Sequence, residues 1–99
     1  MSFYRLTPAA RDDLIEIWNY TAEQWSPEQA ERYLLSIETC LNTLADNPEM
    51  GRERPEINAD YLSFPVEQHV IFYLRAPDHI QVIGILHGRM DVESQLAVR

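Results

Sequence analysis

The sequence contains no lysine, a single cysteine and only three glycines among its 99 residues. One cysteine excludes an internal disulfide and fits a reducing compartment. Three glycines cannot build a glycine-rich phosphate cradle, and neither the G-x-G-x-x-G nor the Walker A pattern occurs. No apolar run approaches membrane-spanning length, and the N-terminus lacks the layout of a signal peptide. We therefore expect a cytoplasmic protein with no cofactor and no membrane contact.

Basic residues are scarce, and every one of them is arginine. Sixteen acids face eight arginines, which gives a formal net charge of −8. Residues 12–49 contain nine acids and a single base, Arg32, whereas residues 50–99 contain seven acids and five arginines. An acidic surface repels phosphate backbones, so we expect no direct binding of nucleic acid. A protein partner, and particularly a basic one, suits this charge better.

The first half of the chain predicts a strand followed by two helices within a single domain, residues 1–99. Residues 3–6 alternate in character as a short strand does. Thr7-Pro8 and Ser26-Pro27 each place a capping hydroxyl before a proline at the first helical position. Asn47-Pro48 ends the second helix. Because the connection between the helices is short, they should form an antiparallel hairpin.

The second half of the chain predicts β-strands. LSFPV (62–66), HVIFYLR (69–75) and IQVIGILH (80–87) are rich in β-branched and aromatic residues and are separated by turn residues. The last two should pair as a hairpin through residues 76–79, while Pro65 suits an edge or a bulge. The predicted fold is an α+β two-layer domain with an N-terminal strand, an antiparallel helical hairpin and an antiparallel β-meander.

Apolar residues of both predicted helices recur at spacings of three and four, which is typical of packed helices. We expect Trp18 and Trp25 in the core, whereas Tyr20 lies at the margin and could line a groove for a partner's helix. Cys40 should be a small buried hydrophobe. The positions on these faces are Ala10, Leu14, Ile17, Trp18, Thr21 and Trp25 on the first helix, and Ala30, Leu34, Ile37, Leu41 and Leu44 on the second.

The histidines do not have the spacing of a zinc site, and the cysteine stands alone on a helix. Whether His69 and His87 share a face depends on the register of the hairpin between them. Pairing of residue 75 with residue 80 would point them to opposite sides, and pairing of 76 with 80 would place them side by side. We expect no metal site.

Three acids near the start of the first helix, Asp12, Asp13 and Glu16, are of the residue types that bind metals. Their position also suits the positive end of the helix dipole, where exposed carboxylates are stabilised. We therefore expect solvent-exposed acids here.

The segment ILHGRMD (85–91) holds His87, Arg89 and Asp91, which are residue types of an acid–base site. Cleavage of RNA needs a base at the 2′-hydroxyl, an acid at the leaving oxygen and cations on the phosphate. The sequence does not complete this set, because it has no lysine, no second histidine close to His87 and no tyrosine after Tyr73. An arginine–aspartate pair is also a common structural device at a strand end. We therefore expect no catalytic residue in the chain.

Several segments in order, from Tyr4 to about Asp91, carry a resemblance to a known family. The chain resembles the ParE toxins of type II toxin–antitoxin systems, within the RelE/ParE superfamily. The matching segments are YRLTPAA (4–10), QAERY (29–33), LADNP (44–48), GRERPEI (51–57), SFPV (63–66), HVIFY (69–73) and ILHGRMD (85–91).

This resemblance implies a RelE-like fold and a toxin that arrests growth by binding and poisoning DNA gyrase, without catalysis. It also implies a ParD-like antitoxin that inactivates the toxin in a hetero-oligomer. Partner contacts are expected at Arg52, Arg54, His87, Arg89 and Asp91.

Family members often carry arginine where this chain has Leu62 and Gly84, so a weakened or re-targeted toxin is one possibility. Two alternatives to the gyrase poison stay open. One is a ribosome-dependent mRNA endonuclease of RelE type, motivated by His87 and Arg89. The other is a non-toxic homologue that only binds an antitoxin.

Overall fold

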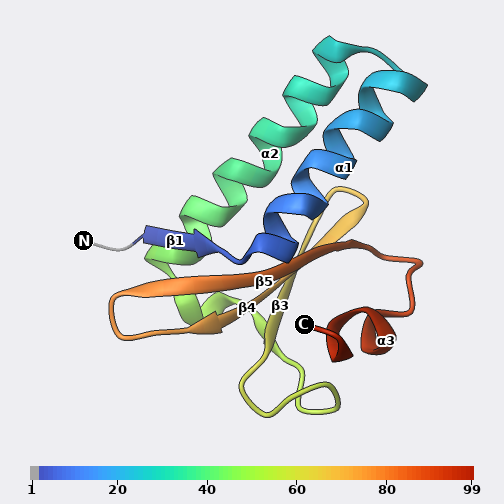
Figure 1. Cartoon of the computed structure of the whole chain (residues 1–99). Helices are drawn as coiled ribbons and strands as arrows, with labels where there is room; N and C mark the ends of the chain where they lie inside the picture. Colours follow the sequence, from blue (N-terminus) through green and yellow to red (C-terminus); the bar gives the residue numbers. More distant parts are fainter. Residues whose placement is uncertain (1–2) are drawn as a thin grey trace.

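The computed structural model describes residues 3–99, which form two layers, a helical hairpin and a five-stranded sheet (Figure 1). The sheet has the order β1-β5-β4-β3-β2, with β1 parallel to β5 and the other neighbours antiparallel. The elements are β1 (Phe3–Leu6), α1 (Pro8–Gln24), α2 (Pro27–Asp46), the 3₁₀ turn η1 (Pro48–Met50), β2 (Arg52–Glu53), β3 (Leu62–Val66), β4 (His69–Arg75), β5 (His79–His87) and α3 (Val92–Ala97).

The predicted strand, hairpin and meander are confirmed, and the structure adds η1, β2 and α3. Thr7 and Ser26 cap their helices, because their hydroxyls accept hydrogen bonds from the N–H groups of Ala10 and Gln29, both at 3.1 Å. Pro65 lies at a free edge, since β2 pairs with β3 only through Leu62 and Ser63. Among residues 3–99, no helix is long and apolar enough to cross a membrane.

The main core lies between the hairpin and the inner face of the sheet, where Leu41, Leu44 and Ile71 are fully buried. A smaller cluster on the outer face places Leu96 of α3 over Phe72 of β4. Both faces of the central strands are therefore covered, as their apolar character predicts.

The prediction that Trp18 and Trp25 belong to the core is wrong, since they are 37% and 75% exposed. The buried face of α1 consists of Ala10, Asp13, Ile17 and Thr21, and Trp18 and Trp25 lie beside it. Figure 1 shows the closed end of the hairpin projecting beyond the sheet, so the end of α1 has no layer to pack on. Cys40 is half-buried and packs against the main core.

A β-bulge at Ile83 sets the register of the β4–β5 hairpin. Arg75 pairs with Ile80, yet Phe72 pairs with Gly84, so β5 contains one extra residue between these pairs. The expectation that this 75–80 pairing separates the histidines is wrong, because one extra residue reverses the alternation of side chains. His69 lies directly opposite His87 as a result.

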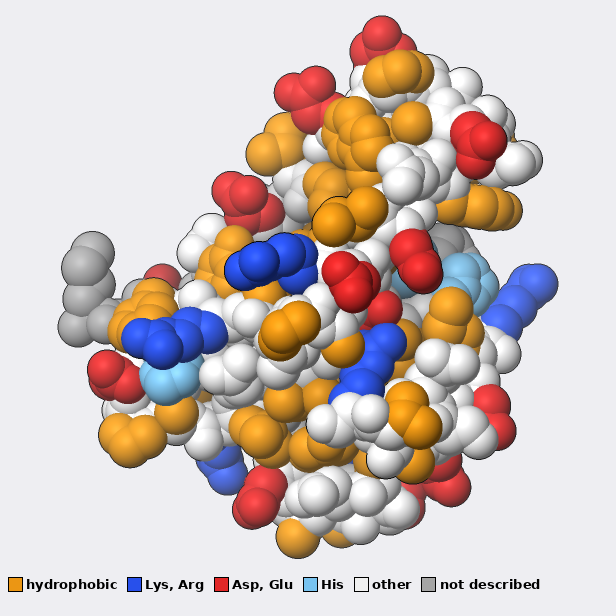
Figure 2. Space-filling model, viewed as in Figure 1, with side chains coloured by type: hydrophobic (Ala, Val, Ile, Leu, Met, Phe, Trp, Pro, Cys, Tyr) orange, Lys and Arg blue, Asp and Glu red, His pale blue; other side chains and the backbone are white. Residues whose placement is uncertain are grey.

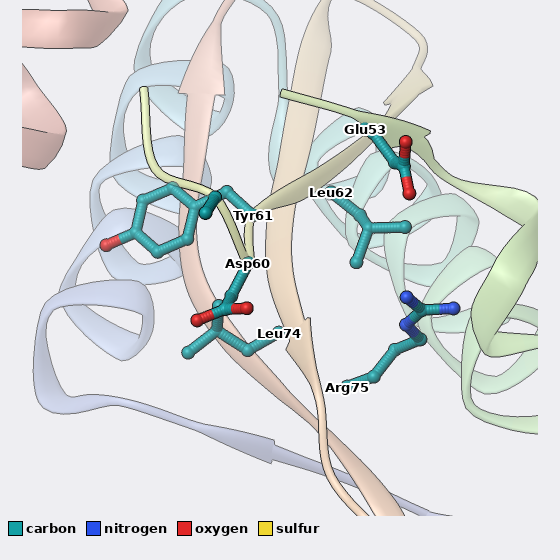
Figure 3. Close-up of a pocket in the computed structure, with 7 residues that line it drawn as sticks. Glu53, Asp60, Tyr61, Leu62, Leu74 and Arg75 are labelled. Carbon is teal, nitrogen blue, oxygen red and sulfur yellow. The ribbon is translucent and has the colours of Figure 1, made fainter. Parts of the chain in front are cut away.

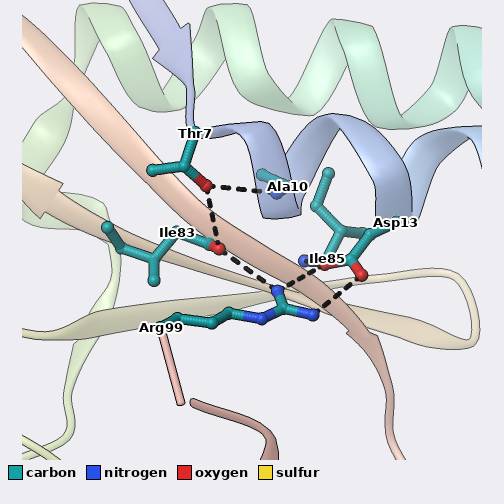
Figure 4. A network of polar contacts seen from close by, with 6 residues as sticks. All are labelled: Thr7, Ala10, Asp13, Ile83, Ile85 and Arg99. Carbon is teal, nitrogen blue, oxygen red and sulfur yellow. Dashed lines mark hydrogen bonds and ion pairs between the residues drawn. The ribbon is translucent and has the colours of Figure 1, made fainter. Parts of the chain in front are cut away.

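β1 pairs only with His79–Val82 of β5. Beyond these residues, side chains form hydrogen bonds with the backbone along the same edge of β5. The Thr7 hydroxyl donates to the Ile83 carbonyl at 3.3 Å (Figure 4). The Asp13 carboxylate accepts a hydrogen bond from the Ile85 N–H at 3.0 Å. The first turns of α1 thus satisfy backbone groups that a neighbouring strand would otherwise bind.

Arg99 fixes Asp13 in this position through two contacts. Its Nη1 lies 2.6 Å from Oδ2 and its Nη2 lies 2.9 Å from Oδ1, while Nη1 also donates to the Ile83 carbonyl at 3.2 Å (Figure 4). The hydrogen bonds to Asp13 raise the pKa of Arg99 further. Gly84 leaves room for this guanidinium, because a Cβ at residue 84 would lie 2.5 Å from Nη1.

The expectation that Asp13 is an exposed acid is therefore wrong, although Asp12 and Glu16 are exposed. The helix dipole alone does not hold Asp13; its backbone and arginine partners do. Within the described residues 3–99, no group of three or more histidine, cysteine or acidic side chains is placed to hold a metal ion.

We predict that Asp13→Ala lowers the free energy of unfolding by about 2 kcal/mol, because it leaves the Arg99 guanidinium and the buried Ile85 N–H without their partner. Asp12→Ala is the matched control, one residue earlier and exposed, and should change stability by less than about 0.5 kcal/mol. Urea unfolding of the three proteins measures both values. Equal stability of the two variants would contradict the role of the Asp13 contacts.

Candidate functional site

A groove of about 300 Å³ lies between α1 and the end of the β4–β5 hairpin, next to the bulge. Ile17, Tyr20 and Thr21 of α1 form one wall, and Ile85 with the two paired histidines forms the other. Met90, from the turn after β5, closes one side and is 46% exposed. The lining is mainly apolar, with polar atoms at a few positions, as in surfaces that bind a partner's side chains. Tyr20, which the sequence places at the margin of the core face, lines this groove, and its contact with a partner's helix stays a prediction.

His69 and His87 contact each other at the groove. Their rings are edge to face, with centroids 5.3 Å apart, and the ring of Tyr33 lies at 5.5 Å from that of His69 in the same manner. The Tyr33 oxygen accepts a hydrogen bond from the Gln68 N–H at 2.9 Å and lies 2.6 Å from Nδ1 of His69. Three segments distant in sequence therefore meet here: α2, the β3–β4 turn and the end of β5.

The hydrogen bonds indicate which ring nitrogen of each histidine carries the proton. Nδ1 of His87 accepts from the Arg89 N–H at 3.2 Å, so the proton of the neutral ring is on Nε2. Because Tyr33 accepts from Gln68, its hydroxyl hydrogen is available to Nδ1 of His69, which favours the same tautomer. Both imidazoles then present an Nε2–H donor.

This tautomer is the wrong one for binding a metal through Nε2, because a ligating imidazole carries its proton on the other nitrogen and donates it. For His87 the other nitrogen already accepts from a backbone N–H, which cannot reverse its direction. The pair is therefore a set of hydrogen-bond donors suited to carbonyl or carboxylate oxygens.

Burial, and then the neighbouring His87, lower the pKa of His69 below its ordinary value. Burial also raises the pKa of Tyr33. Both shifts keep His69 and Tyr33 uncharged near neutral pH, with the Tyr33 hydroxyl as donor and the His69 imidazole as acceptor. With the proton on Nε2 and Nδ1 already hydrogen-bonded, neither neutral imidazole has a free lone pair with which to act as a general base.

The five residues predicted to contact a partner do not form one site. His87 lines the groove and Arg89 follows it on the exposed turn, with no ion pair found for Arg89 within residues 3–99. Asp91 instead caps α3, accepting from the N–H and the hydroxyl of Ser94 at 3.4 and 2.9 Å. The structural alternative of an Arg89–Asp91 pair is therefore wrong.

Arg52 and Arg54 lie at the opposite edge of the sheet, in and just after β2. Arg54 has internal partners: its Nε is 2.6 Å from Glu56 and its Nη1 donates to Ser63 at 3.1 Å, and its guanidinium lies over the ring of Phe72. Arg52 is exposed.

A second cavity, of about 250 Å³, lies near this edge of the sheet (Figure 3). Figure 3 shows the Arg75 side chain near Leu62 and Glu53, with Asp60 and Tyr61 on the other side of the cavity. Leu62 itself is 3% exposed and belongs to the core. The mixed charges and mainly polar lining make this cavity a poorer peptide site than the groove.

Sequence reasoning missed Tyr33 and His69 as parts of the site. Tyr33 reads as an ordinary residue of a packed helix, and His69 meets His87 only because of the bulge. The only sequence signal for their contact was that one of the two possible hairpin registers places His69 beside His87. No residue type marks Ile83 as the extra residue of a bulge.

The sequence profile of the "ParE toxin of type II toxin-antitoxin system, parDE" matches residues 4–92. Toxin ParE1 of Mycobacterium tuberculosis (strain H37Rv) is 38% identical over 96 residues, which cover 96% of this chain and 98% of that protein. Toxin ParE of Escherichia coli is 34% identical over 100 residues, covering 100% and 97%. The solved "Chromosomal ParDE TA system from P. aeruginosa" contains a chain of similar fold, with a TM-score of 0.76 at 20% identity, covering 88% of this chain and 96% of that one.

We predict that the protein loses stability on acidification partly through His69. The folded pKa lies below the ordinary 6.5, so the unfolded chain binds more protons between these two values. The stability linked to His69 is therefore fully present above pH 6.5 and declines as the pH falls through that value. Urea unfolding of the wild type and of His69→Gln at pH 7.5 and about pH 5 measures this.

His69→Gln should decline less than the wild type over this interval, because the titrating group is gone. His87→Gln should decline by an intermediate amount, because the pKa of His69 then rises towards its ordinary value. An undiminished decline in His69→Gln would show that other groups cause the loss.

Proposed function

The chain belongs to the ParE family and is the toxin component of a type II toxin–antitoxin system, and from this premise we propose that it acts by binding DNA gyrase and is neutralised by a ParD-like antitoxin seated in the groove. Family membership carries the toxin function and supports gyrase as the target. The groove between α1 and β5 is the observation that supports the site of the antitoxin.

The groove suits an antitoxin segment that folds on binding. Its apolar wall on α1, with Ile17 and the 64%-exposed Tyr20, can accept apolar side chains. The Nε2–H groups of His69 and His87 can donate to backbone carbonyl or carboxylate oxygens of the same segment. A disordered segment gains such contacts along an extended surface and becomes ordered as it binds.

Action by binding is supported by the state of the polar groups at the site. Both histidine Nδ1 atoms have internal partners, so neither neutral imidazole has a free lone pair for a general base. The many exposed acids of the hairpin also oppose the approach of RNA. Binding of a protein target such as gyrase needs no catalytic base and does not require a phosphate backbone to approach these acids.

A ribosome-dependent mRNA endonuclease is the second candidate. One observation favours it: His69, His87 and Tyr33 lie together, and Arg89 is close in sequence. Sequence alone showed only one histidine at this place. The occupied Nδ1 atoms and the surrounding acids count against an endonuclease, and we rank it below gyrase binding.

We predict that the purified protein inhibits supercoiling by gyrase in a saturable manner and leaves mRNA intact in a translating extract. Supercoiling of relaxed plasmid and primer extension on a reporter transcript provide the two readouts. Unaffected supercoiling at saturating protein would refute the gyrase proposal. Cleaved transcripts that become intact with His69→Gln or His87→Gln would establish the endonuclease instead.

We predict that Met90→Asp weakens binding of the full-length antitoxin at least tenfold, because it introduces a charge at the side of an apolar groove. Met50→Asp is the matched control: Met50 is similarly exposed, at 44%, but lies in η1 away from the groove. Isothermal titration of both variants and of the wild type measures the affinities. Equal losses in both variants, or none in Met90→Asp, would remove the groove from the antitoxin site.

A further inference from the structure

The outer face of the sheet, on the side away from the helical hairpin, is only partly covered. Arg5, Gln81 and Leu74 lie side by side on it, because Arg5 pairs with Gln81 across β1 and β5, and Gln81 pairs with Leu74 across β5 and β4. Phe3 lies on the same face of β1 as Arg5. Tyr61, just before β3, packs with Leu74 against the outer apolar cluster. We call these five residues the open sheet face.

Helix α3 covers the rest of the outer face but not these five residues. Leu96 of α3 packs with Phe72 and Leu86, and Figure 1 shows α3 on the half of the sheet away from β1. On the open sheet face, Phe3 is 38% exposed, Arg5 is also exposed, and the other three side chains are half-buried. A partly apolar strip of the sheet is therefore left in contact with solvent.

Arginine side chains lie at both ends of the open sheet face. The Arg5 guanidinium lies over the ring of Phe3, 5.5 Å from its centroid. At the other end, the Arg54 N–H donates to the Tyr61 carbonyl at 2.9 Å, and Arg52 is exposed on β2. No ion pair is found for Arg5 or Arg52 within residues 3–99. Arginine and aromatic residues are the types that are enriched at the centres of protein interfaces.

The charge of this face differs from that of the hairpin. Helices α1 and α2 contain eight acids and two arginines, whereas the other six arginines of the chain lie outside them. Two acids near the open sheet face, Glu56 and Asp78, are already paired with Arg54 and His79. Figure 2 shows acidic side chains around the projecting hairpin, and arginine side chains over the sheet layer beside hydrophobic ones. The face therefore presents positive charge on an otherwise acidic protein.

The cavity of Figure 3 opens at the edge of the open sheet face, because Tyr61 and Leu74 line both. Its charged groups are Glu53, Asp60 and the exposed Arg75, and no ion pair is found for Arg75 within the described residues. A polar side chain of a partner lying on the face can therefore insert here.

Two features of the open sheet face decide what binds there. Its arginines do not form the continuous row that a phosphate backbone needs, because Arg5 and Arg52 lie on the two edge strands, four strand spacings or about 19 Å apart. A second copy that pairs through the same face would bring arginines against arginines in a symmetric contact. A protein segment with an apolar centre and acidic residues on its sides matches both the strip and its arginines.

We propose that the open sheet face is the surface that contacts gyrase, and that it takes from gyrase an apolar segment flanked by acidic residues. The inference rests on the proposed action on gyrase and assigns that action to one face of the sheet. The groove lies on the hairpin side of the sheet, so the target and the antitoxin use different surfaces of the toxin.

Supercoiling assays with purified gyrase and toxin variants test this proposal. Arg5→Glu/Arg52→Glu reverses the charge at both ends of the face, and Phe3→Asp places a charge on its apolar part. Arg11→Glu/Arg32→Glu is the matched control for the double variant, because both arginines are exposed on the hairpin and the change in net charge is the same. Met50→Asp is the control for the introduced aspartate.

We expect Arg5→Glu/Arg52→Glu to inhibit supercoiling at least tenfold more weakly and Phe3→Asp about fivefold more weakly, with both controls within twofold of the wild type. Arg5→Glu/Arg52→Glu should bind the full-length antitoxin no more weakly than the wild type does, because the groove is unchanged, whereas a misfolded variant would lose both activities. Circular dichroism checks the fold, and Arg5→Glu/Arg52→Glu, which changes exposed side chains alone, carries the test if Phe3→Asp unfolds.

Full inhibition by both Arg5→Glu/Arg52→Glu and Phe3→Asp would overturn the proposal while leaving gyrase as the target. Binding of plasmid DNA by the toxin alone, lost in Arg5→Glu/Arg52→Glu, would assign the arginines to nucleic acid instead. Self-association of the wild type by light scattering, lost in the same variant, would assign the face to a second copy. A wild-type protein that does not inhibit gyrase would refute the proposed target and this inference together.

Discussion

The ion pair between Asp13 and Arg99 takes the place of a missing strand along β5. β1 pairs with only the first four residues of β5, and the backbone beyond them would otherwise be left without partners in a buried setting. Asp13 binds the Ile85 N–H, Arg99 binds the Ile83 carbonyl, and the two side chains bind each other. Helix α1 and the segment after α3 are thereby fixed to the same strand. Within the described residues, every buried side-chain polar atom has a partner.

The bulge in β5 also determines several contacts elsewhere in the structure. The extra residue Ile83 places His87 on the same face of the sheet as His69. The Ile83 carbonyl accepts hydrogen bonds from Thr7 and Arg99, and the bulge lies next to the groove. His69 also contacts Tyr33, whose hydroxyl joins α2 to the β3–β4 turn. The groove and its two donors therefore depend on one inserted residue. The proposed action by binding uses such a preformed surface, because little ordering cost remains when a partner associates with it.

Much of the fold was predictable because its signals are local. Thr7-Pro8 and Ser26-Pro27 fix both helix starts, and the runs of β-branched and aromatic residues predict three strands to within one residue. The candidate site was not predictable from the sequence, because it depends on contacts between residues that are distant in the chain. Asp13 looks like any acid near the start of a helix until Arg99 is placed beside it, 86 residues later. Trp18 and Trp25 follow helical periodicity, but no local signal tells that the hairpin projects beyond the sheet.

Amide hydrogen exchange of the free toxin and of its complex with the full-length antitoxin tests the central claim that the antitoxin binds along α1 and the end of β5. The account predicts slower exchange in α1 and in residues 83–90 on complex formation, with β2 and the loop before β3 unchanged. Protection confined to β2 and residues 54–61, at the opposite edge of the sheet, would contradict it.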